Sequence, residues 1–310
     1  MSELTHEAFS MPYHLKRKES VADGVRRIAL EQMEQARDEL GDEDMASAAA
    51  VHQARKRLKK IRALLRLVRP VLGKGRYGAE NRRFRDLGRA LSGPRDAEVM
   101  VATLEALRED LPAEHAVPPF AGLHGHLVAA RDAAYQNSGT LDDHKADVAK
   151  ALEEARRAVT EWPLEGHGFG MLGPGLKRAY GRGRKTLDAA MTDPTDSRFH
   201  DWRKRAKDHW YHSRLLKKTW PDIMGCRARV LKELSDLLGD DHDLAVFNAM
   251  LDHLPDGVAT TSELDRLRHR VAERQATLRR QALALGRRVY AEKPATLRQR
   301  LGAYWRVWRT

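Results

Sequence analysis

Apolar residues recur every three or four positions along most of the chain, and Gly and Pro interrupt this pattern at intervals. Such spacing is typical of amphipathic helices, and no alternating run of Val, Ile and Thr has the length of a strand. Breakers such as Gly41, Gly93, Pro94 and Pro294 fall between the periodic segments. The pattern predicts helices over residues 19–40, 46–69, 78–92, 95–110, 119–136, 141–161, 173–191, 196–219, 224–239, 241–253, 261–291 and 295–308.

Two segments that lie 148 residues apart share one motif. His52 and His200 each begin the pattern His-x-x-Arg-Lys-Arg-x-Lys, and a second match, around Leu91 and Leu238, follows at nearly the same offset. Two ordered matches at one spacing indicate a tandem duplication. We therefore predict an all-α protein, made of two pseudo-symmetric helical bundles around a basic central groove or cavity. The predicted halves are residues 1–165 and 166–310, joined by a linker rich in glycine over residues 162–175.

Composition narrows the class of protein. The 310 residues are 42% hydrophobic, which excludes global disorder, and carry a formal net charge of +12, which favours anionic partners. Cys226 is the single cysteine, so an internal disulfide is excluded, and we expect it to be a small buried residue. No apolar run is long enough to span a membrane, and the N-terminus lacks the pattern of a signal peptide. We expect a cytoplasmic protein with no membrane partner.

Six basic residues of the helix that contains His52 lie on one face. On a helical wheel they fall within an arc of about 100°, roughly opposite an apolar arc that includes Leu58 and Ile61. Between Val51 and Pro70 the chain has eight Lys or Arg and no acid. Like charges four residues apart on a helix repel by a few tenths of a kcal/mol. The pattern therefore predicts a binding surface rather than an ordinary solvated face. This first stripe comprises His52, Arg55, Lys59, Arg62, Arg66 and Arg69.

The second copy of the motif repeats this arrangement. Its second stripe comprises His200, Arg203, Lys207, Arg214 and Lys217. We expect Asp201 and Asp208 to weaken this stripe, and three tryptophans near it, Trp202, Trp210 and Trp220, to lie at or near the packed side. Neighbouring helices add further candidates. The predicted anion-binding residues are His52, Arg55, Lys56, Lys59, Arg62, Arg66, Arg82, Arg85, Arg89, Arg178, Arg182, Lys185, His200, Arg203, Lys204, Lys207, Arg214, Lys217, Arg229 and Lys232.

The doubled His-x-x-Arg helix, each copy followed by Leu-x-x-x-Arg/His-Asp, resembles the CHAD family, the conserved histidine α-helical domain. The resemblance covers roughly residues 13 to 310. It implies binding of inorganic polyphosphate and association with polyphosphate granules in bacteria. Carried over to this chain, it implies ligands from both stripes: His52, Arg55, Lys59, Arg62 and Arg66, with His200, Arg203, Lys207 and Arg214. Trp210 stands where the first stripe has Arg62, so the resemblance gives no ligand there.

Three signals for catalysis are weak. His242-Asp243 resembles the dyad of metal-dependent phosphohydrolases, but its counterpart in the repeat is Arg95-Asp96. We expect Asp96 and Asp243 to cap a helix or to anchor a neighbouring arginine. The pair His124 and His126 offers a metal no further ligands, and we expect His209 to lie in or beside the core. No glycine-rich Walker loop is present. We predict a non-catalytic protein without a cofactor, with the metal-dependent phosphohydrolase as a remote alternative.

Nucleic acid is the alternative partner. Proteins that bind single strands stack bases on aromatic rings, and the first stripe has no aromatic residue among its cations. Polyphosphate carries about one charge per unit and no base, so it suits a narrow row of Arg and Lys better. The two stripe histidines are either phosphate ligands or hydrogen-bonding residues at helix ends. Nothing in the sequence identifies a protein partner.

Overall fold

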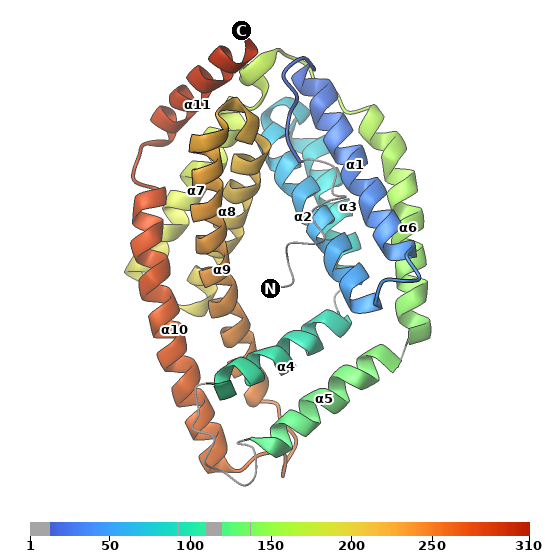
Figure 1. Ribbon diagram of the computed structural model, residues 1–310, viewed down its shortest axis with the longest axis vertical. Helices are drawn as coiled ribbons and strands as arrows, with labels where there is room; N and C mark the ends of the chain where they lie inside the picture. The colour runs from blue at the N-terminus through green and yellow to red at the C-terminus, as the bar shows by residue number, and fades with distance from the viewer. Residues whose placement is uncertain (1–12, 92, 110–119, 137) are drawn as a thin grey trace.

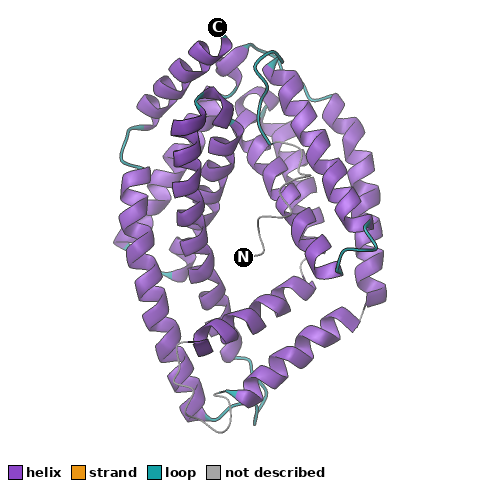
Figure 2. Cartoon of the chain, viewed as in Figure 1, coloured by secondary structure: helices purple, strands orange, loops and turns teal. Residues whose placement is uncertain are grey.

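The computed structural model describes residues 13–91, 93–109, 120–136 and 138–310, and over these ranges the chain is helical with no strand (Figure 2). The prediction of an all-α protein is confirmed. The α-helices are α1 (Val21–Gly41), α2 (Ser47–Leu72), α3 (Lys74–Ala90), α4 (Gly93–Glu109), α5 (Ala121–Gln136), α6 (Ser138–Thr160), α7 (Gly173–Thr192), α8 (Asp196–Leu215), α9 (Pro221–Leu251), α10 (Thr261–Val289) and α11 (Pro294–Arg309). Two short 3₁₀ helices, η2 (Gly168–Met171) and η3 (Lys217–Thr219), precede α7 and α9.

The main hydrophobic core extends through two groups of helices that Figure 1 shows on either side of the molecule, α1, α2, α3 and α6 opposite α7 to α11. The apolar arc predicted for α2 is buried, with Leu58 and Ile61 at most 1% exposed. Helix starts follow local chemistry. The Ser20 side chain accepts from the Asp23 amide at α1, and Thr260 and Glu263 form a reciprocal capping box at α10.

Helix α9 corrects the predicted pattern. It runs unbroken from Pro221 to Leu251, where we predicted two helices that meet near Gly239. The corresponding segment of the first half is broken, because Pro94 has no amide hydrogen to donate and fits only the first turn of the next helix, α4. Gly239 keeps its amide, and glycine inside a helix costs only about 1 kcal/mol relative to alanine. Packing along the long helix outweighs that cost.

A second hydrophobic cluster forms where α4 and α5 cross to the far ends of α9 and α10 (Figure 1). Leu104 and Leu123 pack there with Phe247 and Leu267, and all four side chains are buried. Both clusters therefore contain residues from either side of position 165. The tandem duplication and the division into two halves stay predictions.

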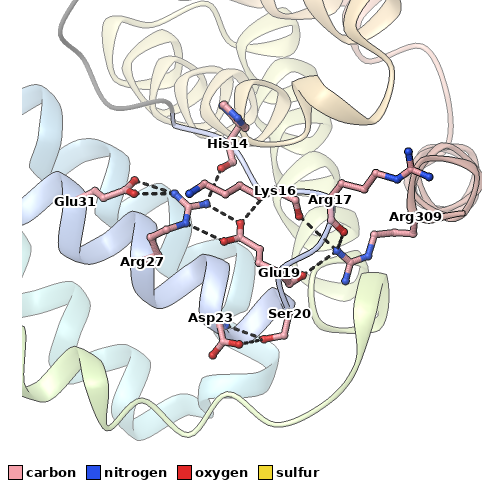
Figure 3. A network of polar contacts seen from close by, with 9 residues as sticks. All are labelled: His14, Lys16, Arg17, Glu19, Ser20, Asp23, Arg27, Glu31 and Arg309. Atoms are coloured by element: carbon pink, nitrogen blue, oxygen red, sulfur yellow. Dashed lines mark hydrogen bonds and ion pairs between the residues drawn. The ribbon is translucent and has the colours of Figure 1, made fainter.

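The two ends of the described chain are tied together by polar contacts (Figure 3). Arg309, at the end of α11, donates to the carbonyl oxygens of Lys16, Arg17 and Glu19. The Glu19 carboxylate in turn accepts from Arg27 of α1 at 2.6 Å. The segment before α1 is thus fixed against both α1 and α11, with Tyr13 buried and His14 half-buried.

Two predicted burials are wrong. Cys226 is exposed, because it lies on the solvent face of α9 with Arg229 and Glu233. Trp220 is 46% exposed, because α8 ends at Leu215 and Trp220 stands outside it as the residue before α9.

Candidate functional site

Helices α2 and α8, which carry the two predicted stripes, converge toward the end of the molecule that bears the C-terminus (Figure 1). At their contact, His212 Nε2 donates to the carbonyl oxygen of Ala63 at 2.8 Å, and Arg66 Nη1 lies 3.0 Å from Asp208 Oδ1. His212 and Asp208 are buried. We call this contact the α2–α8 seam. Cations gather on both sides of it.

The lysine cluster on one side of the seam consists of Lys56 and Lys60 from α2 with Arg203, Lys207 and Arg214 from α8. Burial, together with Arg57, Arg214 and Lys56, lowers the pKa of Lys60 to about 6. Burial also lowers the pKa of Lys207 to about 8, together with Arg203 and Lys56. These effects place cations of both helices within electrostatic reach of one another.

Lys60 is held at the centre of the lysine cluster. Lys60 is only 5% exposed, and its ammonium lies 5.7 Å from the centre of the Tyr13 ring. The Lys60 carbonyl oxygen accepts a hydrogen bond from the Tyr13 hydroxyl at 3.1 Å. Glu39 raises the pKa of Lys60, but this carboxylate is also 2.6 Å from Arg57. The carboxylates facing Lys207 are Asp236 and Asp243. The ammonium of Lys60 is therefore costly to charge in the unliganded protein.

The arginine cluster on the other side consists of Arg62 and Arg66 from α2, Arg178 and Arg182 from α7, and Arg205 from α8, around Asp208. Asp208 Oδ1 pairs with Arg66, and Oδ2 accepts from Arg205 at 3.1 Å. Burial lowers the pKa of Arg182, and Arg205 and Arg178 add to the effect. Burial and Arg66 lower the pKa of Arg62 to about 10, which leaves it charged at neutral pH.

Helix periodicity shows that the clusters face different ways. At 3.6 residues per turn, Lys56 and Lys60 lie about 120° around α2 from Arg62 and Arg66. On α8, Arg203 and Lys207 lie about 180° from Arg205 by the same count. The structure thus places Arg203, Lys207 and Arg214 of the second stripe with Lys56 and Lys60. It does not bring Arg62 and Arg66 of the first stripe together with Arg203 and Lys207.

Asp208 corrects the predicted balance between the stripes. We expected it to weaken the second stripe, but it pairs with Arg66 of the first stripe and with Arg205. The first stripe meets a further acid at its other end, where Arg55 lies 3.7 Å from Asp96. The prediction that Asp96 anchors a neighbouring arginine is confirmed. Helix α2 has no acidic residue, and its arginines pair with acidic residues of α1, α4 and α8.

The remaining predicted residues lie outside the two clusters. Lys204 pairs with Asp201 at 3.0 Å, and Lys232 pairs with Asp236 at 2.8 Å beside a shallow hollow of about 410 Å³ that Arg229 also lines. Several more are spread over the surface of α2, α3, α7 and η3. These are His52, Lys59, Arg82, Arg85, Arg89, Lys185 and Lys217.

His200 and His242 stack with ring centroids 4.1 Å apart, between α8 and α9. Burial, together with His200 and Arg203, lowers the pKa of His242 to about 4. Burial likewise lowers the pKa of His200, so both rings are neutral at pH 7. Asp243 lies close enough to Arg203 to raise its pKa, against the stronger effect of burial. Asp243 therefore interacts with a nearby arginine, as predicted.

The other histidines considered in the sequence have structural surroundings. His209 is buried, with Nε2 2.7 Å from Arg227, which confirms the prediction of a core histidine. His124 lies 3.3 Å from Glu105 on the surface of α5. Over the described ranges, no group of three or more His, Cys, Asp or Glu side chains is arranged to hold a metal ion, and no helix is apolar enough over eighteen residues to cross a membrane.

Sequence reasoning missed Lys60 and Arg205. Both belong to the repeated motif segments, but neither falls on the arc of its stripe. A signal was present for Lys60: counted from His52 and His200, it occupies the same position as Asp208. The two copies thus carry opposite charges at the position where α2 and α8 meet. A cavity of about 610 Å³ between α4, α9 and α10, bordered by Asp240 and Arg274, was also not predicted.

An all-helical fold with paired cationic helices defines the class of protein, and comparison gives the family. The CHAD domain family model matches residues 26–252, so the chain belongs to the CHAD domain family, as the doubled motif predicts. The crystal structure of the CHAD domain from the plant Ricinus communis aligns with a TM-score of 0.66, over 91% of this chain and 95% of that chain. At 16% identity, this likeness shows a shared fold. No curated protein matches the chain in sequence.

Proposed function

We propose that this protein binds inorganic polyphosphate and does not break it down. The lysine cluster carries the proposal, because two helices bring Lys60 and Lys207 into a space where burial and other cations lower the pKa of each. Such an arrangement costs stability in the unliganded chain. A chain of phosphates supplies negative charge at every unit and would offset that cost.

Aromatic rings beside the clusters favour polyphosphate over nucleic acid. Base stacking needs exposed ring faces. Trp202 is fully buried, and Trp210 is half-buried with the Arg214 guanidinium 5.3 Å from its ring centre. The Trp202 ring is therefore closed to a base, and the Arg214 guanidinium lies over the Trp210 ring. Nucleic acid therefore remains the alternative partner, and competition decides between the two.

The geometry around His242 supports binding over hydrolysis. A metal-dependent phosphohydrolase needs several His and Asp ligands aimed at one point. The His242 ring instead stacks on His200, and Asp243 faces Arg203. We propose a cytoplasmic binding protein at polyphosphate granules, with no catalytic step of its own.

A competition titration tests the proposal. Long-chain polyphosphate should displace single-stranded and duplex nucleic acid of equal charge at fixed salt, and affinity should fall linearly with log salt. The double variant Lys60→Gln, Lys207→Gln should weaken binding at least tenfold. The matched control Lys150→Gln, Arg157→Gln changes two cations on the exposed side of α6 and should bind as the original protein does. Equal weakening in both variants, or better competition by nucleic acid, would refute the proposal.

A further inference from the structure

The arginine cluster differs from the lysine cluster in both position and chemistry. The seam between them is filled by the buried side chains of His212 and Asp208, and by the hydrogen bond from His212 to Ala63. A phosphate that contacts Lys60 therefore cannot also contact Arg205. The two clusters share the helices α2 and α8 but not a common space.

The side of the arginine cluster formed by α7 is accessible to solvent. Arg178 and Arg182 are exposed and lie four residues apart on α7, so their guanidinium groups stand one above the other on the same face. Asp208 holds Arg66 and Arg205 with one carboxylate oxygen each, which fixes the direction of both forks. Arg62 and Arg182 also lie within electrostatic reach of this carboxylate, and Arg178 lies within reach of Arg182. Forked N–H donors in fixed positions match the oxygens of phosphate.

The geometry points to a second, independent phosphate-chain site in the arginine cluster, so that one molecule holds two chains and joins them. This inference rests on the proposed function for the lysine cluster. It extends that function from binding to cross-linking, because a protein with two separate sites for one polymer connects different chains once the polymer is long.

Stoichiometry tests the inference. Tripolyphosphate is too short to pass around the seam, so calorimetry at low salt should give two sites per molecule. The variant Arg178→Gln, Arg182→Gln should retain one site, and Lys60→Gln, Lys207→Gln should retain the other. Both substitutions in the arginine cluster are at exposed positions, and a thermal melt confirms that the variant is folded.

Light scattering tests the cross-linking itself. Long-chain polyphosphate mixed with the original protein should scatter strongly at intermediate ratios and clear at excess of either component. Each double variant should bind the polymer without this maximum. One tripolyphosphate site in the original protein, unchanged by Arg178→Gln, Arg182→Gln, would overturn the second site and leave the proposed function standing. Absence of all polyphosphate binding would instead overturn the proposed function.

Discussion

Polyphosphate binding to the lysine cluster should draw protons from solution. At pH 7.5 Lys60, with a pKa of about 6, is almost wholly neutral in the unliganded protein, and Lys207, with a pKa of about 8, is partly so. Bound phosphates favour the charged forms and return both pKa values toward the ordinary range. Lys60 then takes up roughly one proton per molecule, and Lys207 adds a few tenths.

The affinity should follow the same linkage. With one proton taken up, the association constant falls by about tenfold for each pH unit above pH 6, until the pKa of the bound lysine is reached. Calorimetry in two buffers of different ionisation enthalpy measures the uptake directly. Long chains are used because their few end groups contribute little titration. Zero uptake at pH 7.5, or the same uptake in Lys60→Gln, would refute this account of the cluster.

The low pKa of Lys60 should also make the stability of the unliganded protein depend on pH. Between pH 10.5 and 6 the unfolded chain binds a proton at Lys60 that the folded chain does not, so lowering the pH destabilises the fold. The loss is at most about 1.4 kcal/mol per pH unit and ends below pH 6, where both states are protonated. Lys60→Gln should flatten this slope in urea unfolding measured across that range. An unchanged slope would mean that Lys60 is charged in the folded protein.

Three further predictions test packing and chemistry. Gly175→Ala should cost at least about 3 kcal/mol in urea unfolding, because the added methyl would lie 1.7 Å from the Leu67 carbonyl oxygen, whereas Gly41→Ala, with open space around it, should be neutral. Asp208→Asn should lower the free energy of unfolding by about 3 kcal/mol, because two half-buried arginines lose the buried carboxylate that they share; a change below 1 kcal/mol would argue against the seam as described. The protein should release no phosphate from polyphosphate with Mg²⁺ or Mn²⁺ present; release that Asp243→Ala abolishes would restore the phosphohydrolase alternative.

The sequence predicted what depends on one helix at a time. The apolar face of α2 could be read from its period alone, because Leu58 and Ile61 recur on the side that packs. The break at Pro94 followed from local chemistry. The continuity of α9 through Gly239 did not, because it depends on packing with α4, α8 and α10.

The partners of the cations depend on tertiary structure and lay beyond the sequence. No pattern within α2 shows that Arg66 meets Asp208, a residue 142 positions away. The wheel separated the first stripe from the buried apolar arc of α2, but it could not give the direction of this stripe relative to the second stripe. The rotation of each helix about the seam, set by Ala63 and His212, decides which cations share a side.

The crossing of α4 and α5 determines when these two helices can pack during synthesis of the chain. Their apolar side chains, such as Leu104 and Leu123, have no complete packing surface until Leu267 and Leu278 have been synthesised. More than a hundred residues therefore emerge while this face remains exposed, a period in which nascent chains attract chaperones or associate with each other. Leu267 and Leu278 also hold α4 and α5 against α9 and α10. A translation product that ends before them would therefore expose the apolar faces of α4 and α5 and would not form a smaller folded protein.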